Sequence, residues 1–321
     1  MIQLSKKLFT KPQKKAMRDG FGDALLELGK RNPKVVGLCA DLTESVKMEA
    51  FAKKYPHRYF QCGVAEQNLV AVSAGLALAG KIPFASTFGV FFMRTIDQIR
   101  ISVCYNQANV KLAASHGGIT VGADGATHQA LEDLGVMRGL PNMTVVCPAD
   151  YWQTYQATLV IAAKKGPYYL HFGRTEVPMI TTKDTTFQLG KAQILLDGSD
   201  VTVVACGIMV YEALKAADAL KNRVSVQVIN CHTLKPLDKA SLLEAARKTK
   251  AVVTAEEHQV NNGLGSAVAE VLGQNYPVPM EMVGVHDNFG ESGKPDELMK
   301  KYHITSNDIV MAIKKVLKRK K

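Results

Sequence analysis

Short apolar runs alternate with longer amphipathic segments along residues 10–174. The apolar runs contain few polar residues, as expected of strands that are covered on both faces of a sheet. Alternating strands and helices over this length imply right-handed crossovers and a mostly parallel sheet. We expect helices near 22–30, 91–105 and 151–164. The strand candidates are KVVGLCA (34–40), YFQC (59–62), IPFAS (82–86), VKLAAS (110–115), MTVVC (143–147) and YYLHF (168–172).

A second alternating set begins near residue 200, after a polar, threonine-rich stretch at about 175–191 that has no helical period and is typical of a linker. The sequence thus predicts an α/β protein of two three-layer α/β/α domains with mostly parallel sheets, over 1–182 and 191–321. The strand candidates of the second domain are DVTVVAC (200–206), VSVQVIN (224–230), AVVTAEE (251–257) and PMEMVGV (279–285). Its helices are expected near 209–221, 239–248, 263–273 and 305–318.

One acidic residue, Glu66, stands at the start of a run of small apolar residues in CGVAEQNLVAVSAGLALAG (62–80). Small residues favour a helix that packs closely against its neighbours. The simplest interpretation is an acid in the first turn that complements the helix dipole. The alternative is an acid held in apolar surroundings, where it exchanges a proton with a cofactor. Residue 66 alone does not decide between them.

Composition describes an ordinary globular protein, with 47% hydrophobic and 21% charged residues. Much of the net charge of +11 comes from KKLFTKPQKK (6–15) and KKVLKRKK (314–321), which we expect to be solvated tails. No nucleic-acid motif is present. The six scattered cysteines form no CxxC pair and indicate buried, reduced thiols. With no signal peptide and no apolar run long enough to cross a membrane, we expect a cytoplasmic protein.

The densest polar cluster is SHGGITVGADGATHQALEDLGVMRGLPNM (115–143), which follows the strand candidate VKLAAS. Ligands of open α/β sheets bind beyond the carboxyl ends of strands. His116 and His128 flank a glycine-rich loop that carries Asp124, and histidine transfers protons near neutral pH. The alternative is a mobile loop with a helix that starts at Thr127. The spacing fits no standard set of metal ligands.

Another glycine-rich segment, NNGLGSAVAEVLG (261–273), resembles a dinucleotide-binding fingerprint. It has Val268 where the third glycine belongs, and it follows AEEH instead of opening the first βαβ unit. We therefore expect close helix packing there. The chain has neither a Walker sequence nor a GxSxG nucleophile elbow.

Four segments together resemble the carboxyl-terminal half of transketolase, in the family's order and spacing. This resemblance covers essentially all 321 residues and implies a pyrimidine-binding domain followed by the family's carboxyl-terminal domain. The segments are GVAEQNLV, TFGVFFMRTIDQIR, SHGGITVGADGATHQALEDLGVMRGLPNMTVVCPAD and GVHDNFGESGKPDEL.

The family's GDG…N segment, which holds a metal ion and through it the diphosphate of thiamine diphosphate, is absent from this sequence. The chain therefore resembles the carboxyl-terminal subunit of a split transketolase. The resemblance implies a separate amino-terminal subunit that holds thiamine diphosphate and Mg²⁺ or Ca²⁺, with no metal ligand on this chain. It also implies a heterotetramer of two subunits of each kind.

The resemblance assigns cofactor roles to three residues. The acid that matches Glu66 hydrogen-bonds a ring nitrogen of the aminopyrimidine and favours its imino tautomer, whose exocyclic nitrogen deprotonates the thiazolium carbon. Phe88 and Phe91 match the aromatic wall around the pyrimidine; without the resemblance, both would be read as core residues. Arg94 stands where many transketolases have a tyrosine.

The resemblance also implies contacts to the sugar substrates. His116, Asp124 and His128 match positions that contact the hydroxyls and carbonyl of a ketose and assist proton transfer, which makes both histidines catalytic candidates. Ala123 departs from the GEDG of many transketolases. The residues that match the far end of the substrate channel, where phosphate lies, are Arg18, Ser45 and Arg174, with Asp41 lining the same channel.

The leading hypothesis is therefore a transketolase of the pentose phosphate pathway, which moves a two-carbon ketol unit from a ketose phosphate to an aldose phosphate. One alternative is the β subunit of a 2-oxoacid dehydrogenase, but that family lacks the Asp–Thr–His–Gln loop. Another is a deoxyxylulose-phosphate synthase, which normally keeps both halves in one chain. A third is a non-catalytic subunit that only pairs with or regulates a partner.

Overall fold

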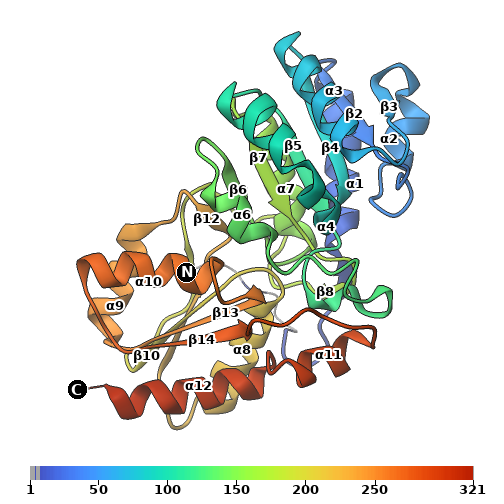
Figure 1. Ribbon diagram of the computed structural model, residues 1–321. Coiled ribbons are helices and arrows are strands. Elements are labelled where there is room, and N and C mark those ends of the chain that lie inside the picture. Colours follow the sequence, from blue (N-terminus) through green and yellow to red (C-terminus); the bar gives the residue numbers. More distant parts are fainter. Residues whose placement is uncertain (1–3, 5–7, 321) are drawn as a thin grey trace.

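Two α/β units lie side by side in the computed structural model, which describes residues 4 and 8–320 (Figure 1). The other residues, which include part of both basic tails expected from the sequence, lie outside the described structure. Each unit is a mostly parallel sheet between two layers of helices, so the predicted fold class is confirmed. The boundaries 1–182 and 191–321 remain a prediction.

The first unit is built on a seven-stranded sheet in the order β12-β6-β7-β5-β4-β2-β3, in which only β12 runs antiparallel to its neighbour. All six strands predicted for this half are present. Their bounds are β2 Val35–Cys39, β3 Tyr59–Gln61, β4 Ile82–Phe88, β5 Lys111–Ser115, β6 Thr144–Val146 and β7 Tyr168–His171.

Alternating residues of these strands face two helical layers. In β5, Ala113 belongs to the core under one layer, whereas Leu112 and Ala114 belong to the core under the other. The first layer holds α1 (Met17–Arg31), α2 (Glu49–Lys54) and α7 (Tyr151–Ala162). The second holds α3 (Glu66–Leu78), a helical segment from α4 (Gly89–Phe92) through η2 (Met93–Thr95) and α5 (Ile96–Gln98) to η3 (Ile99–Tyr105), and α6 (Asp133–Gly139).

The second unit repeats this plan with the strand order β14-β13-β10-β11-β9, in which only the edge strand β9 is antiparallel. Its strands are β9 Gln193–Leu196, β10 Val201–Ala205, β11 Val226–Asn230, β13 Val252–Gln259 and β14 Met280–Val285. Its helices are α8 (Met209–Leu220) and α12 (Ser306–Arg319) on one face, α9 (Lys239–Thr249) and α10 (Leu264–Asn275) on the other, and the short α11 (Pro295–Lys301).

Three short strands tie distant parts of the chain together, and none of them was predicted. β12 (Thr233–Lys235) lies beyond residue 191 but pairs with β6 of the first unit. It covers a sheet edge that would otherwise leave backbone groups unpaired, and its Leu234 is buried. β1 (Lys14–Ala16) pairs with β8 (Glu176–Pro178), so the segment expected to be a free linker begins as a paired strand.

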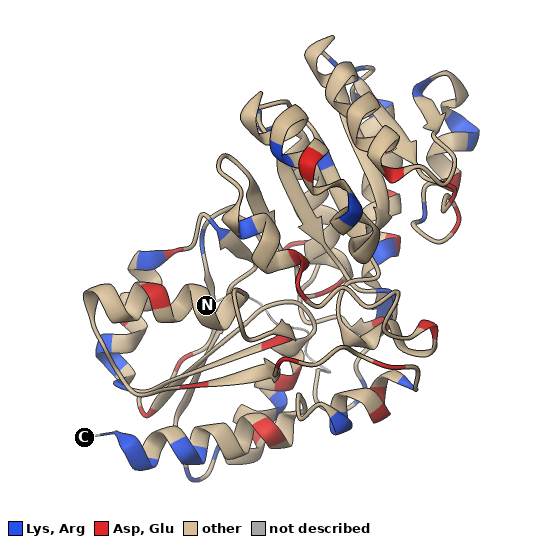
Figure 2. Ribbon diagram, in the orientation of Figure 1, with Lys and Arg blue, Asp and Glu red and all other residues tan. Residues whose placement is uncertain are grey.

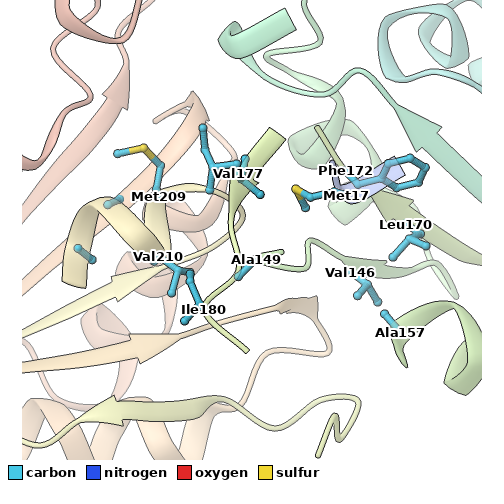
Figure 3. Packing of buried hydrophobic residues seen from close by; sticks show 14 of the residues in the cluster. Met17, Val146, Ala149, Ala157, Leu170, Phe172, Val177, Ile180, Met209 and Val210 are labelled. Atoms are coloured by element: carbon cyan, nitrogen blue, oxygen red, sulfur yellow. The ribbon is translucent and has the colours of Figure 1, made fainter. Parts of the chain in front are cut away.

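One hydrophobic cluster continues from the first unit into the second. Figure 3 shows Met17 and Phe172 of the first unit in the same cluster as Met209 and Val210 of α8. Val177 of β8 belongs to it as well. Because this shared core is apolar, the second unit is held in one position beneath the carboxyl ends of the first sheet.

The expectations about tails, thiols and membranes can be compared with the structure. The basic stretch at 314–319 is the end of α12, seen at the bottom of Figure 2, and so is a helix and not a tail. Lys315 and Arg319 pair there with Glu281, although both side chains remain exposed. The six cysteines are free, and only Cys62 is not fully buried. No helix in the described part of the chain has the length and apolar character needed to span a membrane.

Candidate active site

The polar cluster lies where β4 and β5 end. Ser115 is the last residue of β5, and His116 follows it with a φ of 58°, a conformation that few residues other than glycine adopt. The imidazole Nδ1 of His116 lies 2.9 Å from the Ser115 hydroxyl. A 3₁₀ turn, η4 (Ile119–Asp124), continues the loop. The helix that the sequence placed at Thr127 begins only at Asp133.

Four rings gather at this edge of the sheet. Phe88 stacks on His116 with 3.6 Å between ring centroids and on Phe91 with 5.3 Å. His128 meets the edge of both phenylalanines, at 6.1 Å from Phe88 and 5.4 Å from Phe91. Its Nδ1 is 2.9 Å from the Thr127 hydroxyl. The structure therefore brings together both predicted histidines and both predicted phenylalanines.

Glu66 is the first residue of α3, and its side chain is only 3% exposed. Its Oε2 accepts a hydrogen bond from Arg94 Nη1 at 3.3 Å, although the Arg94 side chain is 53% exposed. The same guanidinium lies 4.9 Å from the centre of the Phe91 ring. A planar donor thus lies over an aromatic ring and donates to a buried carboxylate.

Arginines form the basic end of the site. Arg18 Nη1 donates to the Ser45 carbonyl at 2.9 Å, while its buried Nε has no hydrogen-bond partner among the described residues. Arg174 Nη1 donates to the Val121 carbonyl at 3.0 Å and to Asp124 Oδ1 at 3.1 Å. Two guanidinium groups on separate elements therefore approach the His116 turn.

The charges at this end shift two pKa values. Burial lowers the pKa of Arg18 from its ordinary value, and the positive charge of Arg174 lowers it further against the opposing effect of Asp19. Burial, together with the charges of Arg18, Arg174 and His128, lowers the pKa of His116 to about 3. His116 is therefore neutral at physiological pH, with one ring nitrogen that donates and one that accepts.

Two predicted channel residues are placed differently from the others. Ser45 contacts Arg18 through its backbone carbonyl, whereas the sequence argument used its hydroxyl. Asp41 is exposed, with a φ of 59°, and its backbone N–H donates to Gln61 at 2.6 Å. Asp41 lies just after the end of β2 and is exposed, and this exposure is the one feature that agrees with a position in a substrate channel.

Sequence reasoning missed the buried ionisable groups behind the histidine loop. Asp133 Oδ2 lies 2.7 Å from both His171 Nδ1 and the Tyr169 hydroxyl. Glu257 of β13 reaches across from the second unit and accepts from the Thr120 hydroxyl at 2.8 Å. The available signal was the pair of acids in TAEEH, a segment otherwise typical of a strand covered on both faces.

The other acid of that pair, Glu256, explains the glycine-rich segment at 261–273. Glu256 accepts from the backbone N–H groups of Leu264 and Gly265, each at 2.7 Å, at the start of α10. A Cβ at Gly263 would lie 2.0 Å from the Glu256 carboxylate. A buried side chain therefore occupies the helix N-terminus that a phosphate would use in a dinucleotide fold.

The site fits a flat heterocycle with a hydrogen-bonding edge. Arg94 already supplies a planar group over Phe91 that donates to Glu66. Among the described residues, no group of three or more His, Cys, Asp and Glu side chains is arranged to hold a metal ion. The aromatic part of the site, with its buried acid, and the basic end are thus both on this chain.

Comparison with known proteins identifies the family. "Transketolase, pyrimidine binding domain" matches residues 13–180, and "Transketolase, C-terminal domain" matches 190–309. A 6-deoxy-6-sulfo-D-fructose transketolase subunit of Clostridium sp. is 44% identical and covers 95% of this chain and 95% of its own length. The transketolase of Mus musculus is 37% identical and covers 93% of this chain but only 48% of its own length.

A solved structure described as "Split gene transketolase, inactive beta4 tetramer" has 50% sequence identity and a TM-score of 0.90. It covers 95% of this chain and 99% of its own chain. The family and fold predicted from the sequence are thereby confirmed. The chain belongs to the transketolase family, as a carboxyl-terminal section that matches subunits of split transketolases over nearly their whole length.

Proposed function

We propose that this chain forms half of the active site of a thiamine-diphosphate-dependent transketolase and transfers a two-carbon ketol unit between sugar phosphates together with an amino-terminal subunit. The observation that carries the proposal is the buried Glu66 carboxylate, whose partner in this structure is the exposed Arg94. Thiamine diphosphate, when bound, supplies the carbanion chemistry by which a ketol unit is transferred. The protein binds and orients the coenzyme and polarises its ring.

Glu66 is suited to accept, through its carboxylate, a hydrogen bond from a protonated ring nitrogen. Its carboxylate is fixed at the start of α3 and shielded from water, so a charge-assisted hydrogen bond there is stronger than at the surface. Phe88 and Phe91 supply the flat wall against which a ring packs. Arg94 is the group that such a ring replaces, and its exposure lets it turn outward without a large loss of contacts.

We assign the hydrogen bonding of the ketose oxygens to the neutral His116 and to His128, which packs on the same Phe88 ring, and to Asp124, which pairs with Arg174. Arg18 and Arg174 are proposed to bind the substrate's phosphate, as the unpartnered Nε of Arg18 supports. Ser45 and Asp41 are assigned to the same channel. In this proposal the histidines at the sheet edge transfer protons, and the arginines beside them bind the phosphate.

Phosphate recognition has its own test. Arg174→Ala should raise KM for a phosphorylated sugar about tenfold more than KM for the corresponding free sugar, because one charge-assisted contact is lost. Lys30→Ala, on the exposed end of α1, is the matched control and should leave both KM values unchanged. Equal effects of Arg174→Ala on the two sugars would remove the phosphate role.

The partner is proposed to hold Mg²⁺ or Ca²⁺ and the coenzyme's diphosphate. An apolar surface on the first unit supports association: Val64, Val72 and Leu78 of the α3 region are exposed, as is Tyr105 of the adjacent η3. Water-exposed large apolar groups gathered on two packed helices are typical of an interface. We propose an assembly of two subunits of each kind, acting in the cytosol, where the free thiols are stable.

The relatives favour this proposal over a 2-oxoacid dehydrogenase subunit, a deoxyxylulose-phosphate synthase or a non-catalytic subunit. The relative of solved structure is described as an inactive tetramer, which agrees with a chain that needs a second kind of subunit. Ketol transfer from xylulose 5-phosphate to ribose 5-phosphate is the test. We expect none from this chain alone and full turnover after mixing with an amino-terminal transketolase section; turnover by the chain alone would contradict the proposal.

A further inference from the structure

A buried carboxylate from the second unit accepts hydrogen bonds from the turn that carries His116. Glu257 lies on β13 and is 7% exposed. Its Oε2 accepts two hydrogen bonds from Thr120, one from the hydroxyl at 2.8 Å and one from the backbone N–H at 3.2 Å. Both donors belong to the start of η4, four residues after His116. The contact therefore joins the two units behind the site.

The turn is built to receive this side chain. A Cβ at Gly118, where φ is 84°, would lie 2.1 Å from the Glu257 carboxyl carbon. A Cβ at Gly117 would lie 2.2 Å from the His171 ring. Glycine allows this close approach at both positions, and at Gly118 it also allows the positive φ, so the sequence HGG makes room for two ionisable side chains beneath the turn.

A second layer of charge lies behind Glu257. His171 faces the turn from β7 and is bonded to Asp133 at 2.7 Å, with Tyr169 on the same carboxylate oxygen. Burial alone lowers the pKa of His171, but the charges of Asp133 and Glu257 raise it to about 10. A protonated His171 therefore provides a positive charge near Glu257. Burial still raises the pKa of Glu257 to about 7, against the opposing effects of the Thr120 hydrogen bond and the His171 charge, so its carboxyl is partly ionised at neutral pH.

Packing alone does not explain Glu257. The neighbouring Glu256 is equally buried, and both of its oxygens cap the N-terminus of α10. Glu257 caps no α-helix, and the described residues offer its oxygens no bonds except those to Thr120 in the 3₁₀ turn η4. An apolar side chain of similar size would fill the same volume without the cost of burying a charge. What the carboxylate adds is a fixed position for the turn.

We propose that Glu257 is a positioning residue, which holds the 116–120 turn from the second unit and thereby fixes the orientation of His116 toward the substrate. His116 itself is bonded to Ser115 and stacked on Phe88, so it is restrained on the side of the first sheet. Glu257 restrains the other end of the same turn. The effect on catalysis rests on the proposed role of His116. The restraint of the turn by the hydrogen bonds of Glu257 does not depend on that role.

The test compares three variants of the full chain with wild type. Glu257→Leu removes the acceptor, Glu257→Gln keeps an acceptor oxygen, and Glu256→Leu is the matched control on the same strand. Amide hydrogen exchange at Gly117, Gly118 and Thr120 is measured on the isolated chain. We expect about tenfold faster exchange in Glu257→Leu, near wild-type exchange in Glu257→Gln and no change at the turn in Glu256→Leu.

Thr120→Val removes the shorter of the two bonds to Glu257, the one from the hydroxyl, and leaves the backbone N–H bond in place; it serves where Glu257→Leu does not fold. It should also speed exchange at the turn. Equal exchange at the turn in Glu257→Leu and Glu256→Leu, or unchanged exchange in Thr120→Val, overturns the grip on the turn whether or not the chain takes part in ketol transfer.

Positioning of His116 is then measured on the chain mixed with its amino-terminal partner. Glu257→Leu should lower kcat about tenfold and leave the dissociation constant of thiamine diphosphate within twofold, with Glu257→Gln restoring most of kcat. A kcat equal to that of Glu256→Leu would refute positioning. Failure of the wild-type pair to turn over would instead refute the proposed function, since the exchange result stands independently.

Discussion

Two buried glutamates of this chain, Glu66 on α3 and Glu256 on β13, both place a carboxylate at the start of a helix but differ in what surrounds it. Glu256 is fully buried and accepts from two backbone N–H groups of α10. Glu66 is nearly as buried, yet its partner is a single guanidinium that is half exposed. Both oxygens of Glu256 are held by backbone hydrogen bonds, as expected of an acid with a structural role. Glu66 has a side-chain partner that a ligand could replace.

The comparison indicates how the two interpretations of an acid at a helix start are separated. Burial is common to both residues and decides nothing. What differs is whether the carboxylate's partners are backbone groups of the helix or an exposed side chain at the surface. On this criterion Glu66 is available for a ligand and Glu256 is not, and the following changes test that distinction.

The largest effect is expected from Glu66→Gln. This substitution keeps the shape of the side chain but removes the negative charge that polarises the coenzyme ring. Turnover of the chain mixed with its partner should fall about 10²–10³-fold, because a buried charge-assisted bond is lost from the reacting group. The free energy of unfolding should change by less than about 1 kcal/mol. Ketol transfer and urea unfolding of the same preparations measure both values.

Glu256→Leu should show the opposite behaviour. The N–H groups of Leu264 and Gly265 lose their acceptor, so unfolding should become easier by about 1–3 kcal/mol. Folded enzyme should keep its turnover within a factor of about two. If Glu256→Leu abolished turnover at a temperature where the protein is folded, the distinction between the two acids would fail.

The pH dependence of stability sharpens the same contrast. Burial raises the pKa of Glu256 to about 8, even though the N–H groups of Gly265 and Leu264 favour its charged form. A carboxyl with a raised pKa in the folded state stabilises the fold fully below its unfolded pKa of about 4.5, and that contribution is lost as the pH rises toward 8.

The free energy of unfolding should therefore fall between about pH 4.5 and 8, and Glu256→Gln should make this fall shallower. His171 adds a fall in the same direction at higher pH, because its pKa is raised from 6.5 to about 10. Urea unfolding at several pH values measures the slope. An unchanged slope in Glu256→Gln would show that its carboxyl does not titrate in the folded protein over this range.

The smallest effect is expected from Arg94→Met, which removes the group that pairs with Glu66 but keeps an apolar side chain over Phe91. Because water screens the half-exposed Arg94, we expect its pair with the buried Glu66 to contribute about 1 kcal/mol, and thiamine diphosphate should bind the mixed subunits up to about fivefold more tightly. Calorimetric titration measures this affinity. Weaker binding would show that Arg94 contacts the coenzyme instead of standing in its place.

The sequence predicted well wherever a single periodic pattern controls the structure. The runs that form β2, β5 and β10 are covered on both faces of the sheet, so every residue in them is buried. Such strands can be recognised from consecutive, mostly apolar residues. β12 escaped prediction because its three residues gain their partner from a strand almost ninety positions earlier, and no local pattern encodes that pairing. The late start of α6 at Asp133 has a similar cause, since Gln129 is held by backbone carbonyls of the loop.

The same limit applies to the site. His116, His128, Phe88 and Phe91 were found because they lie in segments that resemble a known family. Glu257 could not be found that way, because its role depends on the second unit lying under the first sheet. The pairing of Glu66 with Arg94 also depends on two segments meeting in space, and only the structure shows it.

A crystal structure of this chain assembled with an amino-terminal transketolase section and thiamine diphosphate tests the central claim most directly. We predict that a Glu66 carboxylate oxygen lies about 2.6–3.2 Å from a ring nitrogen of the coenzyme, with the Arg94 guanidinium displaced from Phe91. A structure in which Glu66 keeps its bond to Arg94 while the coenzyme ring binds elsewhere would contradict it.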